Sequence, residues 1–593
     1  MAQLCWRSAI RLARPPHEKH VPQTLRLSTA GNRLLRPGAA LQTASGRISF
    51  STSRVLHRLR TSPLRQTWPT SQAKWISQNP SLQPIHLQSA FPTKTVIFLL
   101  VLSGLGYYFL DTLEPDWTDN VLDSYADISQ ATPLHFYNTK EDLDHWLQFH
   151  ISDPSVALKN PDVLKLVSAQ FDQLAFGWMM SAEDAAKENI PVTHGCRLRS
   201  NEPCEDFYAL GTSPGVGGKS WNYWAVMDGH AGRHTALHLQ WTLIPFVSSA
   251  LLSLPAYAPS LDVENTIKQT FLRIDKQLMD SARTAANWFP PATAAAVAAL
   301  TPAFSGSCAL LATFDPEKDI LRVACTGDSR AVLGRFNTST NCYTSIPLST
   351  DQTGFNPTEV SRLTALHPEE PSIIDPKSGR LLGIAVTRAF GDHRWKWDND
   401  FIKTVQHKFW GPSPRAGNKT PPYMTAEPEV TETQVVRADG GMVGSDFMIM
   451  ASDGLWDRIS SEHAVECVQR WLEARARGHL DPKYLAANPP PFNAAMTPDP
   501  GVTCDPEKDE SVDWRATPEF FAIEDENAAV CLARNALGGT RRGLFTGVLS
   551  VPGPMGRYAV DDTTVMVVFF DRVGEGSGKK NAREGGTRWW KPW

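Results

Sequence analysis

The sequence lacks paired cysteines, and its first 110 residues are almost without acids. Nine cysteines are scattered over 593 residues with no C-x-x-C pair, which excludes a zinc ribbon or a thioredoxin-type motif and gives no support for a disulfide framework. Residues 1–110 hold 14 Lys and Arg against one acid, Glu18, whereas residues 111–593 hold 44 against 61, a net charge of −17. The acidic segment 111–593 lacks the excess of basic residues that a nucleic-acid-binding face needs, so we expect no nucleic-acid partner.

Residues 1–92 have the composition of a targeting segment, because they are rich in Arg, Ser, Thr and Gln. Arg7, Arg11 and Arg14 are spaced to share one face of a helix, and apolar residues are available for another face. A basic amphipathic helix without acids is typical of a mitochondrial presequence, and we predict this role for residues 1–92. A disordered basic tail or a nucleic-acid-binding arm is the alternative.

An uncharged stretch, Thr95–Leu110, follows the leader and is bracketed by Lys94 and Asp111. As a helix its 16 residues would span about 24 Å, somewhat less than the ~30 Å hydrocarbon core of a bilayer. We predict residues 93–110 to be a single anchor in the mitochondrial inner membrane. The catalytic domain that follows the anchor then lies either in the intermembrane space or in the matrix.

The remaining chain divides by composition into an extension, a main domain and a tail. Residues 111–189 are predicted to be an N-terminal extension with helical stretches, one of them Val163–Trp178. Residues 190–572 show short apolar runs separated by turns and are predicted to be one catalytic domain, with insertions at about 393–422 and 474–522. Residues 573–593 are predicted to be a disordered tail.

Local patterns within the main domain predict both strands and helices. Asp319–Leu333 indicates strand, tight turn and strand, with Gly327 at the turn, while Asp446–Ala451 and Thr563–Phe570 indicate buried strands. Ser460 is expected to cap a helix with the apolar stripe Ala464, Val465, Val468, Trp471 and Leu472. Strands that meet by hairpins, with helices between groups of them, favour an α+β fold over a parallel sheet.

Five aspartates adjoin these apolar strands and small residues: Asp206, Asp228, Asp328, Asp453 and Asp561. A single Asp-Gly is usually a turn, but anions that converge at sheet edges repel one another and need a cation. Oxygen donors without Cys select a hard ion such as Mg²⁺ or Mn²⁺. Two such ions that share a water lower its pKa and neutralise phosphate charge.

The order of these motifs resembles that of the metal-dependent type 2C (PPM) Ser/Thr protein phosphatases. The matching pieces run from Ser200 to Phe570, about 370 residues. They are NEPCED, VMDGHAG, SGSCALLA, TGDSRAVL, LSTDQTGFNPTEVSRLTALHP, AVTRAFGD, AEPEV, MIMASDGLWD and DDTTVMVV. The resemblance implies two packed antiparallel β-sheets flanked by helices, with two metal ions at one edge.

The resemblance also implies a role for each matching acidic residue. Asp228 would bridge both metals, and the Gly229 carbonyl would bind the second. Glu205 and Asp206 would act through bound water. Asp453 and Asp561 would complete the shell of the first metal. Asp328 together with Asp453 would hold a third, weaker ion.

His230 follows Asp228 directly and matches the family histidine that protonates the departing Ser or Thr oxygen. A structural histidine beside a turn is the alternative. Arg388 and Asp392, in the motif TRAFGD, are expected to support the site or bind phosphate rather than to ligate metal.

One position departs from the common family pattern. Many members have an Arg that binds phosphate four residues before the Glu of the Glu-Asp pair, and here that position is Asn201. The variant looks like the pyruvate dehydrogenase phosphatase branch, where Asn is expected and where the mitochondrial leader also fits. Arg197 or Arg199 would then reach the phosphate, or both are surface charges.

The sequence therefore predicts an enzyme that uses Mg²⁺ or Mn²⁺ to hydrolyse phosphoserine and phosphothreonine in proteins. By resemblance, the substrate would be the phosphorylated α subunit of pyruvate dehydrogenase E1. The alternative is a pseudophosphatase that acts as a membrane-anchored binding or scaffold protein. A pseudophosphatase predicts missing metal aspartates, and none is missing from the sequence.

Overall fold

The computed structural model describes most of the chain from residue 163 onward. The described residues are 139–144, 163–438, 444–480, 499–508, 510–551 and 555–571. The predicted presequence (1–92), anchor (93–110) and tail (573–593) lie outside them. Of the described helices, α10 (His234–Leu252) is long and apolar enough to cross a membrane. Leu239, Leu243 and Val247 of α10 are, however, buried in the protein core.

Two antiparallel sheets form the centre of the domain. The six-stranded sheet has the order β1 (Ala175–Met179), β2 (Val192–Leu198), β16 (Thr563–Phe569), β13 (Phe447–Ala451), β9 (Arg330–Asn337) and β10 (Cys342–Pro347). The five-stranded sheet has the order β12 (Glu429–Gln434), β8 (Ile320–Thr326), β7 (Ala309–Asp315), β4 (Ser220–Met227) and β3 (Phe207–Pro214). Short strands pair beside them as β11 (Phe390–Gly391), β6 (Gly306–Ser307) and β5 (Gly229–His230), and as β14 (Val502–Asp505) with β15 (Glu510–Trp514).

The sheets pack face to face through alternate residues of their strands. Trp224 and Val226 of β4 share one core with Met448 and Met450 of β13. The intervening residues of β4 face α10, and those of β13 face helices on the opposite side. Because both faces of each strand are covered, the central strands are apolar at nearly every position.

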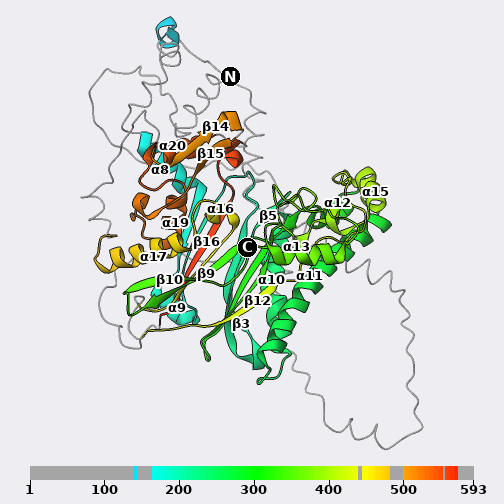
Figure 1. Ribbon diagram of the computed structural model, residues 1–593, viewed down its shortest axis with the longest axis horizontal. Helices are drawn as coiled ribbons and strands as arrows, with labels where there is room; N and C mark the ends of the chain where they lie inside the picture. The colour runs from blue at the N-terminus through cyan, green and yellow to red at the C-terminus, as the bar shows by residue number, and fades with distance from the viewer. Residues whose placement is uncertain are drawn as a thin grey trace, which may run out of the picture. The chain divides into compact units, whose positions relative to one another are not determined.

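Helices cover both outer faces, as Figure 1 shows, which gives the layered α+β architecture expected from the sequence. One face carries α10, α11 (Ser260–Trp288) and α12 (Ala294–Phe304). The other carries α8 (Val163–Leu174), α17 (Ser461–Ala476), α19 (Ala528–Ala536) and α20 (Arg542–Leu549). The shorter helices are α9 (Ala182–Glu188), α13 (Pro357–Leu366), α14 (His393–Lys396), α15 (Asn399–Phe409) and α16 (Asp453–Trp456). The predicted helix start is confirmed, because the Ser460 side chain accepts a hydrogen bond from the His463 N–H at 3.2 Å.

One local prediction was wrong, and the error concerns strand pairing. The predicted helix Val163–Trp178 ends at Leu174, because Ala175–Met179 pairs with β2 as the edge strand of the six-stranded sheet. The strand, turn and strand predicted around Gly327 are confirmed as β8 and β9, and these two strands lie in different sheets. Gly327 has φ +106°, and a Cβ there would come within 2.3 Å of the Cys308 Sγ.

The two predicted insertions contain ordered elements. Residues 393–422 hold α14 and α15, and Trp397, Ile402 and Phe409 pack in one cluster with residues of α11 and α12. Within 474–522, the described residues include the end of α17 and the β14–β15 hairpin. The first insertion is thus held against the domain by an apolar cluster that it shares with α11 and α12.

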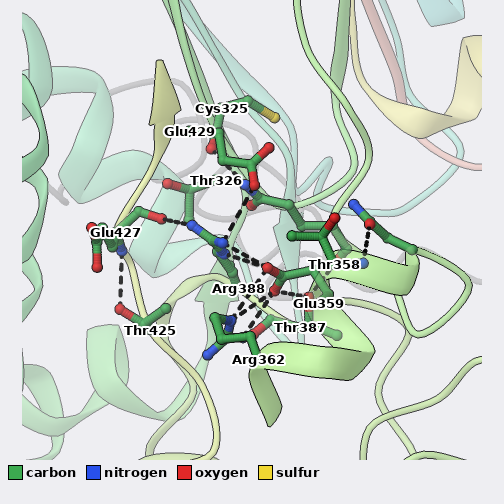
Figure 2. A network of polar contacts seen from close by, with 12 residues as sticks. Cys325, Thr326, Thr358, Glu359, Arg362, Thr387, Arg388, Thr425, Glu427 and Glu429 are labelled. Atoms are coloured by element: carbon green, nitrogen blue, oxygen red, sulfur yellow. Dashed lines mark hydrogen bonds and ion pairs between the residues drawn. The ribbon is translucent and has the colours of Figure 1, made fainter. Parts of the chain in front are cut away.

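A buried ion-pair network anchors α13 to the segment that precedes Asp392 (Figure 2). Glu359 of α13 is fully buried and accepts hydrogen bonds from Arg388 at 2.6 Å and Arg362 at 2.8 Å. Thr387 donates a further one at 2.6 Å. Burial alone raises the pKa of Glu359, but these hydrogen bonds outweigh it and hold the pKa at about 2.

The low pKa predicts a pH-dependent contribution to stability. The contribution of ionised Glu359 to the free energy of unfolding is fully present above the unfolded pKa of about 4.5. It is lost as the pH falls towards the folded pKa of about 2. We expect Glu359→Gln to lower the free energy of unfolding by on the order of 3 kcal/mol at pH 7. The difference from wild type should shrink to roughly half near pH 3.

Urea unfolding at several pH values measures this difference, with the exposed Glu369→Gln as a matched control. The control is expected to stay within about 0.5 kcal/mol of wild type. A deficit for Glu359→Gln that is the same at pH 7 and pH 3 would contradict the assignment.

Candidate active site

A cleft of about 1130 Å³ opens where the ends of the two sheets come together. Asp228 follows β4 of the five-stranded sheet, and Asp453 follows β13 of the six-stranded sheet, one residue beyond Ser452. Asp328 lies in the turn that passes from one sheet to the other. All three aspartates line the cleft. Residues far apart in sequence are thus brought together by the strands that carry them.

The carboxylates of Asp228, Asp328 and Asp453 each offer an oxygen that lies within 4.8 Å of the others. Burial, followed by the charges of neighbouring aspartates, raises the pKa of Asp228 and Asp453 well above the usual range. Burial also raises the pKa of Asp328 to about 6. Three negative charges at this separation require a cation between them to remain ionised together near neutral pH.

The donors at this cluster fit a hard divalent ion. Cys308 Sγ donates a hydrogen bond to Asp328 Oδ1 at 3.3 Å. Burial and the nearby aspartates raise the pKa of this thiol well above its ordinary value, so Cys308 stays protonated and is a poor metal ligand. The oxygen donors that remain suit Mg²⁺ or Mn²⁺.

Glu205 and Asp206 lie next to this cluster at the start of β3. Asp206 is buried and accepts a hydrogen bond from the Ser452 hydroxyl at 2.7 Å. Burial and the charge of Asp562 raise the pKa of Asp206 to about 7, and its own charge acts on Asp228 and Asp453. Glu205 Oε1 accepts a hydrogen bond from the Gly232 N–H at 2.6 Å. The loop after β5 and the start of β3 are thereby joined.

Gly229 is required by a close approach of two backbone segments. A Cβ at this position would lie 2.3 Å from the carbonyl oxygen of Glu205. Any larger residue would push Glu205 away from the loop that carries Asp228. The glycine that follows Asp228 is therefore needed for this close packing and not only for a turn.

Asp561 and Asp562 have different environments although they are neighbours. Asp561 lines the cleft and forms an ion pair with Arg557, outside the close group of three carboxylates. Asp562 is buried and accepts hydrogen bonds from the backbone N–H groups of Ser200 at 2.6 Å, Asn201 at 2.9 Å and Glu205 at 2.7 Å. Burial raises the pKa of Asp562, but these hydrogen bonds outweigh it and lower the pKa.

The Asn201 side chain contributes to the same arrangement by donating from Nδ2 to Asp562 at 3.1 Å. Asn201 therefore fixes the backbone of the Glu205 segment to the strand end at Asp562. Sequence reasoning did not identify Asp562, although its position directly after Asp561 and before a buried strand was a usable signal.

His230 and Asp392 form a hydrogen-bonded pair at the wall of the cleft, with His230 Nε2 and Asp392 Oδ2 2.7 Å apart. Burial alone lowers the pKa of His230, but the charge and hydrogen bond of Asp392 outweigh it and raise the pKa. Gly306 leaves room for the pair, since a Cβ there would lie within 2.2 Å of both side chains. Asp392 itself has φ +56°, a backbone strain that is common at functional sites.

The predicted phosphate-binding arginines point elsewhere. Arg199 forms an exposed ion pair with Glu202 at 2.9 Å, and Arg197 donates to the Cys204 carbonyl at 3.4 Å while stacking on Phe207. Arg388 belongs to the Glu359 network of Figure 2. Arg557, which sequence reasoning missed, lines the cleft instead, and its charge acts on Glu205 and Asp453.

Comparisons with known proteins agree with this geometry. The family model Protein phosphatase 2C matches residues 192–488. A protein phosphatase 2C homolog of Schizosaccharomyces pombe is 34% identical, over 63% of this chain and 79% of the relative. Mitochondrial pyruvate dehydrogenase (acetyl-transferring)-phosphatase 1 of Saccharomyces cerevisiae is 33% identical, over 65% and 70%. Its Homo sapiens counterpart is 30% identical, over 52% and 55%.

The match to the family model, the high coverage of the Schizosaccharomyces pombe relative and the sandwich of two antiparallel sheets lead to one conclusion. The chain belongs to the protein phosphatase 2C family and is a metal-dependent protein Ser/Thr phosphatase.

Proposed function

We propose that the cleft around Asp228, Asp328 and Asp453 removes phosphate from the α subunit of pyruvate dehydrogenase E1 in mitochondria. The observation that carries the catalytic part is the convergence of these three carboxylates beside the His230–Asp392 pair. The substrate is supported by relatives from yeast and human that are named mitochondrial pyruvate dehydrogenase phosphatases. No feature of the described residues favours a pseudophosphatase.

We further propose that the carboxylates hold two Mg²⁺ or Mn²⁺ ions, with a third, weaker ion beside them. Asp228 would bind both principal ions, and the Gly229 carbonyl the second. Asp453 and Asp561 would serve the first ion, with Glu205 and Asp206 acting through bound water. Asp328 and Asp453 would hold the third. When bound, these ions supply a water of lowered pKa and offset the negative charge of the phosphoryl group.

In this proposal His230 donates a proton to the departing Ser or Thr oxygen. The Nε2–H group donates to Asp392, which orients the ring, so Nδ1 would be the nitrogen that donates to the substrate. Because the pKa of His230 is raised, the ring can carry a proton to be donated near neutral pH. Among the arginines that line the cleft, we assign to Arg557 the contact with the phosphoryl oxygens, because its charge acts on Glu205 and Asp453 beside the carboxylate cluster.

Asp228→Asn is expected to lower the rate of dephosphorylation of phosphorylated pyruvate dehydrogenase by at least about a hundredfold, because a shared ligand loses its charge. The exposed Asp262→Asn serves as the matched control and should retain activity. In a thermal melt, Mn²⁺ should raise the midpoint of wild type more than that of Asp228→Asn. Full activity of Asp228→Asn would refute the site. Wild-type activity on a phosphopeptide, but none on pyruvate dehydrogenase, would refute only the substrate.

His230→Ala is expected to slow hydrolysis of a phosphoserine peptide by about a hundredfold or more, since alkoxide is a poor leaving group without an acid. An aryl phosphate such as p-nitrophenyl phosphate needs little protonation and should slow far less. Steady-state kinetics with both substrates measures the difference. Equal slowing of the two substrates would argue against a proton-donor role.

We propose that the anchor 93–110 holds the enzyme in the mitochondrial inner membrane with the catalytic domain in the matrix, where the proposed substrate requires it. In mitochondria with a ruptured outer membrane, the catalytic domain is therefore expected to resist added protease until detergent is present. Degradation without detergent would place the domain in the intermembrane space. That outcome would remove pyruvate dehydrogenase as the substrate but would leave the chemistry of the cleft untouched.

A further inference from the structure

A wall of the cleft carries positive charge that the proposed reaction does not use. Arg394 and Arg415 line the same cleft as His230 and Asp228, and both come from the segment 393–422. The Arg415 guanidinium lies 4.1 Å from the centre of the Trp395 ring, and that of Arg394 lies 5.8 Å from it. One indole ring therefore holds two cations in one neighbourhood.

Hydrogen bonds fix the Arg415 guanidinium and the main chain of both arginines. Arg415 Nη1 donates to the Leu382 carbonyl at 2.5 Å. The main chain is held as well, because Asn399 donates to the Arg415 carbonyl at 2.9 Å and Asn418 to the Arg394 carbonyl at 3.1 Å. The Arg415 guanidinium is thus held in place before any ligand arrives, which lowers the entropy that a ligand would have to overcome.

Neither Arg394 nor Arg415 has a carboxylate partner within the part of the chain that the structure describes. Two other arginines of the cleft do, since Arg330 pairs with Asp351 at 2.5 Å and Arg557 pairs with Asp561, whereas Arg380 donates to the Gly383 carbonyl at 3.3 Å. The Nε atoms of Arg394 and Arg415 are buried and without a hydrogen-bond partner. Two half-buried like charges without a counter-ion raise the free energy of the empty cleft.

The nearby carboxylate does not compensate for this charge. Asp392 acts electrostatically on both arginines, but it is already hydrogen-bonded to His230 at 2.7 Å. Burial lowers the pKa of Arg415, and the charge of Arg394 lowers it further. An incoming anion that contacts the exposed ends of the guanidinium groups would relieve the repulsion between them.

We propose that Arg394 and Arg415 form a second anion-binding subsite of the cleft, which takes an acidic side chain or a second phosphoryl group of the substrate protein. This subsite presupposes that the cleft is the phosphatase active site. A phosphoprotein that enters the cleft presents its flanking residues to the walls, and the planar guanidinium groups suit carboxylate or phosphate oxygens. The exposed Phe355, which also lines the cleft, offers the flanking chain an apolar contact.

The subsite is tested with the full chain and a set of phosphoserine peptides that differ only in the residues flanking the phosphoserine. One peptide carries Asp, one Ala, one Lys and one a second phosphoserine at the varied positions. Wild type is expected to show a kcat/KM about tenfold higher on the Asp peptide than on the Ala peptide, a factor that one charge-assisted contact accounts for. The comparison of Asp with the second phosphoserine identifies which anion the subsite prefers.

Arg394→Gln and Arg415→Gln are expected to lose this preference while leaving kcat/KM on the Ala peptide unchanged. Arg415→Glu should reverse the preference in favour of the Lys peptide. Arg283→Gln is the matched control, because Arg283 also stacks on an aromatic ring, 4.6 Å from the centre of Phe401, but does not line the cleft. Arg557→Ala should instead lower kcat/KM on every peptide to a similar degree.

Three results would overturn the subsite: no preference in wild type, a preference that survives both Gln variants, or an equal loss on all peptides in those variants. An unchanged melting temperature separates the last result from misfolding, and Arg415→Lys, which keeps the charge, is expected to restore part of the preference. Failure of wild type on every peptide would instead refute the proposed active site itself.

Discussion

Three carboxylates whose oxygens lie within 4.8 Å repel one another, and burial strengthens this repulsion because the surroundings screen charge poorly. Such a group would separate if it were carried by loops. Here Asp228 directly follows β4, and Asp453 follows β13 after one intervening residue. Both strands are held by an apolar core that the two sheets share. The packing energy of the sandwich therefore opposes the electrostatic cost of the site, and the site retains a strong affinity for a cation.

A second set of buried charges supports the His230–Asp392 pair indirectly. Glu359 on α13 binds Arg388, and Arg388 lies four residues before Asp392, the partner of His230. Arg388 also donates to the Glu427 carbonyl at 2.9 Å, so the network joins three segments behind the cleft (Figure 2). The strained backbone of Asp392, with φ +56°, persists because its surroundings are fixed in this way.

Local sequence patterns predicted the elements whose signals are local. The Ser460 cap with its apolar stripe, and the apolar strands around Phe447–Ala451 and Thr563–Phe569, needed only neighbouring residues. The strand Ala175–Met179 was predicted as helix, since its pairing with β2 is a tertiary contact with no local period. The turn at Gly327 between two strands was predicted correctly, but a glycine turn does not specify whether the next strand joins the same sheet.

The candidate site divides in a similar way. Aspartates at strand ends could be selected from sequence, and the motif order assigned each an expected role. The contacts of Asn201 with Asp562, the place of Arg557 and the space left by Gly306 depend on segments more than 70 residues apart in the chain. No spacing rule relates such segments, so these contacts emerged only from the three-dimensional arrangement.

The turn at Gly327 has a mechanical consequence. Since it carries Asp328 across from one layer to the other, the acidic residues are anchored in both halves of the sandwich. A divalent ion bound by carboxylates from both sheets would cross-link the two layers at the open edge. Separation of the layers at this edge would then release the ion. Loss of such an ion would then loosen this edge, while the apolar core that both sheets share would still hold the layers together.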